Sequence, residues 1–198
     1  MNTRKLIAVA GLALCLPACV PSLNPFYTDK DVVFDPQLIG TWKEKSEAQE
    51  TEVWKFEKTE DKAYKLVVTD KDGKQGEFAA HLFKLNQDYF LDLIPNDCNY
   101  ATNQTDMVGW SMFPGHLLAR VPQIEPELKL AFFNYDWLAQ QLTNNPHILA
   151  HHREGDRFVL TATTRDLQRF VLKHLAEGEL FNKPAEFVPQ AKRAGSGS

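Results

Sequence analysis

Apolar and polar residues alternate along most of the chain between residues 38 and 161. Trp54 and Phe56, for example, stand on either side of Lys55, and such alternation is typical of strands with one buried face. Polar turns rich in Asp, Asn, Lys and Gly separate the apolar runs and predict successive hairpins in an antiparallel meander. After a first strand that begins near residue 38, strands are expected at 54–57, 64–69, 78–85, 89–94, 116–121, 127–133, 147–153 and 157–161, with an edge strand at 186–188.

Two helices are expected to interrupt the strands. The first follows Asn134, whose side chain suits a helix N-cap, and is stopped by the Asn-Asn-Pro sequence at 144–146. The second begins at Thr163 or Thr164 and ends near Gly178. Apolar residues recur in it at helical spacing, at Leu167, Phe170, Val171 and Leu175.

Strands in this number, with two helices in one domain, predict a mainly β protein (β+α). The expected architecture is an antiparallel barrel of about eight to nine strands, and a β-sandwich is the alternative. The first strand contains Gly40-Thr41-Trp42, which is similar to the Gly-x-Trp that opens the lipocalin family. The resemblance implies a lipocalin-like barrel, and bacterial lipocalins are often lipoproteins.

The longest apolar run occupies residues 6–16 and follows the cations Arg4 and Lys5. A cationic start, an apolar run and small residues after it are the features of a secretory signal peptide. Eleven residues of helix cover about 16 Å, roughly half of the hydrocarbon core of a bilayer. The run is therefore predicted to direct export and not to span a membrane.

The end of this segment, Leu16-Pro17-Ala18-Cys19, resembles the lipobox of bacterial lipoproteins. The resemblance implies cleavage before Cys19, a diacylated sulfur on Cys19 and usually an acylated amine; two or three acyl chains hold a protein stably on a membrane. Val20 in place of Asp implies the outer membrane where the host has one. A plain cleaved signal peptide with an incidental cysteine is the alternative.

These features divide the chain into four predicted parts. They are a lipoprotein signal peptide (1–18), the lipidated Cys19 with an extended tether (19–37), a single β-rich domain (38–190) and a flexible tail (191–198). Of the three cysteines, Cys15 leaves with the signal peptide and Cys19 is acylated, so Cys98 remains alone and no internal disulfide is expected.

Composition narrows the function by exclusion. With 43% hydrophobic and 24% charged residues, the chain has the proportions of an ordinary globular protein. Its formal net charge of −4 becomes more negative once Arg4 and Lys5 are removed, so nucleic acid is not an expected partner.

Known catalytic motifs are missing from the body of the chain. No Gly-x-Ser-x-Gly nucleophile turn stands between a strand and a helix, and no glycine-rich loop suits a phosphate. His147, His151 and His152 are close in sequence, but in a strand only the first two share a face, so at most two of them reach one metal ion. No metal or cofactor is predicted.

The aromatic residues of the strands, Trp54 and Phe56 among them, are expected to fill the barrel core. The competing hypothesis is that the barrel holds one apolar ligand. In that case Trp110, in a long loop predicted at 95–112, forms part of a lid, and an inward-facing Arg120 receives a carboxylate; an outward-facing, solvated Arg120 is the alternative.

The sequence therefore predicts a non-enzymatic, lipid-anchored protein of the bacterial cell envelope. Its partners are the membrane, through the lipid on Cys19, and either an apolar small molecule or an envelope protein. The alternative function is an envelope hydrolase with an unrecognised or metal-assisted site.

Overall fold

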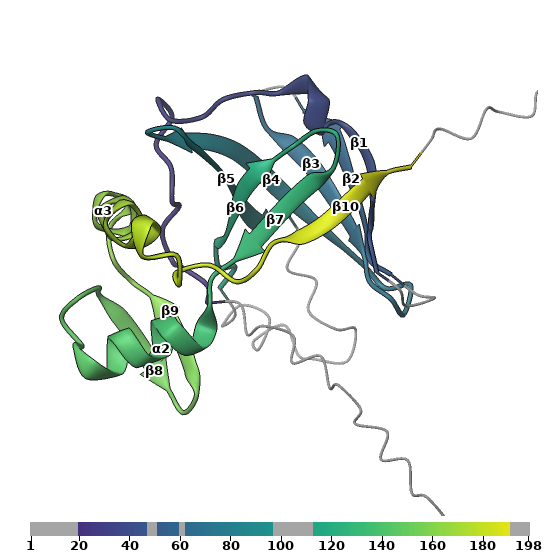
Figure 1. The fold of residues 1–198 in the computed structure, drawn as a ribbon. Helices are drawn as coiled ribbons and strands as arrows, with labels where there is room; N and C mark the ends of the chain where they lie inside the picture. Colours follow the sequence, from purple (N-terminus) through teal and green to yellow (C-terminus); the bar gives the residue numbers. More distant parts are fainter. Residues whose placement is uncertain (1–19, 47–50, 60–61, 97–112, 191–198) are drawn as a thin grey trace, which may run out of the picture.

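The computed structural model describes residues 20–46, 51–59, 62–96 and 113–190. At its centre is a closed antiparallel barrel of eight strands in the order β1-β10-β7-β6-β5-β4-β3-β2 (Figure 1). The predicted fold class is thus confirmed: the protein is mainly β, with a barrel and two helices. The barrel strands are β1 (Gly40–Glu44), β2 (Val53–Lys58), β3 (Tyr64–Thr69), β4 (Gln75–Leu85), β5 (Asp88–Pro95), β6 (Leu117–Gln123), β7 (Leu128–Phe132) and β10 (Ala185–Pro189).

The last strand closes the barrel. β10 pairs with β1 on one side and with β7 on the other, so the expectation of an edge strand at 186–188 is wrong. The alternation of buried and exposed residues identifies a strand, but it does not show how many neighbours the strand has. At one end of the barrel, the short 3-10 helix η1 (Pro36–Leu38) places the fully buried Leu38 against the interior.

A second layer covers one side of the barrel. It consists of α2 (Tyr135–Asn144), a separate hairpin of β8 (His151–Glu154) and β9 (Arg157–Leu160), α3 (Thr164–His174) and the short η2 (Leu175–Glu177). The Asn134 side chain accepts the Trp137 N–H, and the Thr163 side chain accepts the Asp166 N–H. Both predicted helices therefore begin at their predicted caps. In the described part of the chain, no helix has the length and apolar character needed to cross a membrane.

Two hydrophobic cores share the strands β4, β5 and β6. On β5, Leu91 and Leu93 pack inside the barrel, whereas Phe90 faces outward and packs under the second layer. The outer core also contains Leu118 of β6 and Phe170 of α3. These strands bury both faces, which explains their nearly continuous apolar sequence.

Residues 20–34, which we call the strap, run along the outside of the barrel from the β8–β9 side to η1 (Figure 1). Ser22 exchanges two backbone hydrogen bonds with His116, of 2.9 and 2.8 Å. On its other side, Leu160 N–H donates to the Pro21 carbonyl and Leu23 N–H donates to the Leu160 carbonyl. The strap therefore joins the barrel to the second layer.

The prediction of a tether over residues 19–37 needs correction for its described part. The strap is extended, as expected from its prolines, but Val20, Ser22 and Phe26 are buried. Its apolar side chains are too few and too irregularly spaced to show a period, so alternation could not predict that they complete the outer core.

A buried carboxylate holds the centre of the strap. Asp92 of β5 is 0% exposed; its Oδ2 accepts the Phe26 N–H at 2.8 Å, and its Oδ1 lies 2.6 Å from His116 Nδ1. Burying a carboxylate is unfavourable unless its oxygens receive hydrogen bonds. Docking of the strap supplies one of these bonds.

Gly115→Ala tests how closely the strap is docked. A Cβ at position 115 would lie 2.6 Å from Pro21 Cβ, so we expect a loss of about 1–3 kcal/mol in unfolding free energy from steric overlap. Urea denaturation measures it. In the control Gly76→Ala, the new Cβ meets the Phe78 ring at an ordinary 3.4 Å, and stability should hold or rise. Equal stabilities for the two variants would contradict close docking.

Candidate functional site

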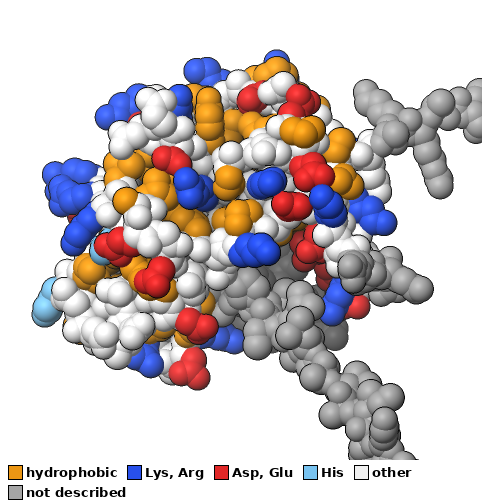
Figure 2. Space-filling model, viewed as in Figure 1, with side chains coloured by type: hydrophobic (Ala, Val, Ile, Leu, Met, Phe, Trp, Pro, Cys, Tyr) orange, Lys and Arg blue, Asp and Glu red, His pale blue; other side chains and the backbone are white. Residues whose placement is uncertain are grey.

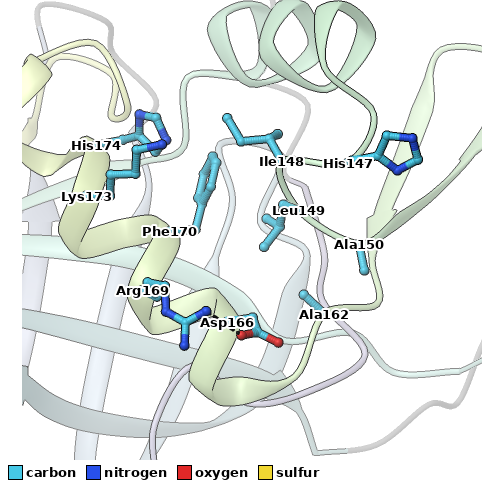
Figure 3. Close-up of a pocket in the computed structure, with 10 residues that line it drawn as sticks. All are labelled: His147, Ile148, Leu149, Ala150, Ala162, Asp166, Arg169, Phe170, Lys173 and His174. Carbon is cyan, nitrogen blue, oxygen red and sulfur yellow. Dashed lines mark hydrogen bonds and ion pairs between the residues drawn. The ribbon is translucent and has the colours of Figure 1, made fainter.

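One candidate site lies between α3 and the residues that precede β8. We call it the α3 groove; its volume is about 430 Å³ (Figure 3). Asn145 ends α2, and the turn after it carries residues 147–150 alongside α3. The groove is lined by His147, Ile148, Leu149, Ala150, Ala162, Asp166, Arg169, Phe170, Lys173 and His174.

The floor of the α3 groove is apolar. Phe170 and Leu149 are buried members of the outer core, and Ile148 packs against it. In Figure 3, Phe170 from α3 faces Ile148 and Leu149 across the groove. This floor suits the hydrocarbon part of a ligand.

One edge of the groove is cationic. Arg165, Arg169 and Lys173 follow one another at intervals of four residues along α3 and so lie on one side of the helix. Asp166 forms an ion pair with Arg169 at 3.2 Å, while Lys173 is exposed and has no ion-pair partner among the described residues. The edge therefore carries positive charge in a protein whose net charge is −4.

His174 lines the inner part of the groove and is 5% exposed. Its Nδ1 lies 2.9 Å from Glu177 Oε1, and its Nε2 is buried without a hydrogen-bond partner in the described structure. His174 also packs against Phe170, with ring centroids 4.6 Å apart. The groove thus has an unsatisfied polar atom in its wall next to the apolar floor.

The barrel interior, where an apolar ligand was hypothesised, is filled by packed side chains. Trp54 and Phe56 are both buried there with ring centroids 6.2 Å apart, and Trp54 lies 5.5 Å from the Phe187 ring. They form the core, which is the first of the two predictions for the strand aromatics. Trp110, predicted as part of a lid, lies outside the described residues, as does Cys19.

Arg120 does not point into the barrel. Its neighbours Ala119 and Val121 belong to the interior core, so alternation along β6 turns Arg120 outward. Its Nη2 donates to Asp88 Oδ1 at 2.7 Å. The hypothesis of an inward-facing Arg120 is therefore wrong. Arg120 faces outward, but its side chain is only 35% exposed and is paired with Asp88, so it is not the fully solvated side chain of the alternative.

Other surfaces of the barrel are less suited to a ligand. A larger hollow of about 920 Å³ is lined by residues of β1 and β2 and by Gln37 and Glu125, but its Lys55 and Glu57 form an ion pair with each other. The face seen in Figure 2 carries interspersed positive and negative side chains. Charged side chains of the barrel strands are also paired with one another, including Lys129 of β7 with Glu186 of β10 at 3.2 Å.

The histidines predicted as a cluster do not form a metal site. His147 lies in the turn before β8, and Figure 3 shows its ring directed away from the groove. Across the described residues, no group of three His, Cys, Asp or Glu side chains has a geometry that could hold a metal ion.

A polar cluster that sequence reasoning missed lies under the strap. It contains Asp92, His116, His81 and Tyr27. His81 stands opposite Asp92 on the neighbouring strand and stacks on the Tyr27 ring at 4.6 Å. Burial and the Asp92 charge raise the pKa of Tyr27 to about 12. Asp92 can orient the His116 ring, as a carboxylate does in a catalytic triad, but no nucleophile among the described residues forms a hydrogen bond with His116. No residue of this cluster lines either of the hollows described above.

Burial lowers the pKa of His81 below its usual 6.5; the nearby His116 adds to this and Asp92 opposes it. The unfolded chain therefore takes up the proton first as pH falls. The stability that neutral His81 provides is complete above pH 6.5 and is lost as pH falls below that value.

Scanning fluorimetry should show that the melting temperature of the wild type falls when the pH is lowered from 7.5 to 5.5. It should fall less in His81→Phe, a variant that keeps an aromatic ring against Tyr27. His152→Gln changes an exposed histidine on β8 and should keep the wild-type pH dependence. An unchanged pH dependence in His81→Phe would contradict this assignment.

Comparisons of the chain with protein-family models, with curated proteins and with solved structures gave no match. The functional argument therefore depends on the residues of this chain. The α3 groove combines an apolar floor with the exposed Lys173, which has no ion-pair partner among the described residues.

Proposed function

We propose that this chain is a non-enzymatic, lipid-anchored protein of the bacterial cell envelope, acylated on Cys19. In a host with two membranes it resides at the outer membrane. Its body binds a small acidic molecule with an apolar tail in the α3 groove. One observation carries the proposal of a ligand: a single groove contains both a buried apolar floor and Lys173, which has no ion-pair partner among the described residues.

The anchor is supported by the order of features at the start of the chain. Arg4 and Lys5 precede the apolar run, and Leu16-Pro17-Ala18-Cys19 follows it. Cysteine is the residue type that carries the thioether-linked lipid in bacterial lipoproteins. Cys19 stands at the position where the resemblance to a lipobox requires a cysteine.

A small molecule fits the groove better than a protein segment does. The volume of the α3 groove, about 430 Å³, lies within the range of about 300–1,000 Å³ that is common for small-molecule sites. Protein interfaces bury larger and flatter surfaces. The filled barrel interior leaves the outer surface as the place for binding.

Metabolic labelling with an alkyne fatty acid tests the anchor. The wild-type chain, expressed in a bacterial host and tagged through the alkyne, should carry the label and partition into detergent. Cys19→Ser should lose both properties, whereas Cys98→Ser should keep them. Label retained in Cys19→Ser would contradict acylation at this residue.

Titration with a dansylated undecanoic acid tests the groove. The full chain carrying Cys19→Ser should bind this anionic amphiphile saturably and with one-to-one stoichiometry. Lys173→Gln should weaken binding about tenfold through loss of a charge-assisted contact. Ala150→Trp, at an exposed position in the lining, should obstruct the groove and abolish binding.

Lys71→Gln is the matched control, because it removes an equally exposed charge from the turn between β3 and β4. It should bind as the parent does. Equal affinity in Lys173→Gln, Ala150→Trp and Lys71→Gln would place the ligand elsewhere and overturn the proposed site.

A further inference from the structure

The docked strap leaves no spacer between the body and residue 19. Val20 is buried, and residues 21–23 are hydrogen-bonded on both sides, to His116 and to Leu160. Adjacent Cα atoms are about 3.8 Å apart. A lipid on Cys19 therefore begins within a few ångströms of the folded body, and the surface around residue 20 must lie near the lipid headgroups.

Two of the large exposed apolar side chains of the described residues lie on the segments next to this surface. Across the described residues three are exposed: Phe113 (70%), Leu23 (42%) and Ile39 (40%). Leu23 and Phe113 belong to the two segments that the Ser22–His116 bridge joins. We call these two residues the apolar patch. Ile39 follows η1 at the opposite end of the barrel (Figure 1).

The same surface carries no formal charge from its own segments. Residues 20–25 and 113–117 include no Asp, Glu, Lys or Arg, although 24% of the chain is charged. His116 is turned toward the buried Asp92 and not toward solvent. Contact of these two segments with a bilayer interface removes apolar surface from water without desolvating an ion of their own.

We propose that the apolar patch lies against the bilayer and fixes the body on the membrane in one orientation. This inference rests on the proposed acylation of Cys19. The acyl chains supply most of the membrane affinity, and Leu23 and Phe113 add a second contact that prevents the body from rotating about the anchor. The η1 end of the barrel then points away from the membrane.

The test uses the lipidated full chain in vesicles of phosphatidylethanolamine and phosphatidylglycerol. In a Cys98→Ser background, an environment-sensitive fluorophore is attached at Phe113→Cys, Leu23→Cys or Ile39→Cys, all at exposed positions. Labels at 23 and 113 should be quenched by nitroxide lipids and shielded several-fold from aqueous iodide. The label at 39 should show the reverse.

Phe113→Asp, with the label at 23, should lose much of this shielding because the bilayer contact would desolvate a charge. Ile39→Asp is the matched control and should leave the label at 23 shielded. Melting temperatures confirm that each variant is folded.

Four results would overturn the orientation. Equal quenching of the three labels means that the body rotates freely, and shielding that survives Phe113→Asp means that the patch does not hold it. Absence of acyl label on Cys19 overturns the proposed anchor and this inference together. Acylated Cys19 with iodide-accessible labels at 23 and 113 overturns this inference alone.

Discussion

The buried carboxylate of Asp92 is the interaction on which the arrangement of the two layers depends. An ionised carboxylate in an apolar interior is unfavourable by several kcal/mol unless hydrogen bonds replace its water. The Phe26 N–H and the His116 ring replace part of that water from two separate segments. The strap, the start of β6 and the centre of β5 are therefore fixed together, and Asp92 is satisfied only when all three are in place.

The packing of the barrel explains why the proposed ligand site lies outside it. Because the strap and the second layer cover β4 to β6, these strands are apolar on both faces. Eight strands enclose a space that is just wide enough for side chains to fill, and Trp54, Phe56 and Phe187 fill it here. The outer core instead leaves a partly open edge where α3 meets residues 147–150, and the groove forms at that edge.

The sequence predicted the features that depend on neighbouring residues. Alternation identified the barrel strands, and the caps at Asn134 and Thr163 located both helices. The sequence did not predict the second neighbour of β10, the docking of the strap or the α3 groove. Each of these three features brings together segments that lie far apart in the chain. The outward direction of Arg120 followed from alternation along β6, but only once the register was known.

The strap and the α3 groove are connected through α3. One side of this helix holds the strap: Thr164 Oγ1 donates to the Pro25 carbonyl at 2.8 Å, and Gln168 Nε2 donates to the Phe26 carbonyl at 3.0 Å. Another side, with Arg169 and Lys173, forms the edge of the groove. The helix that shapes the proposed ligand site is thus tied to the segment that leads to the proposed lipid. A strap fixed against α3 therefore gives the groove a constant position relative to Val20, where the described chain begins, which a flexible tether would not do.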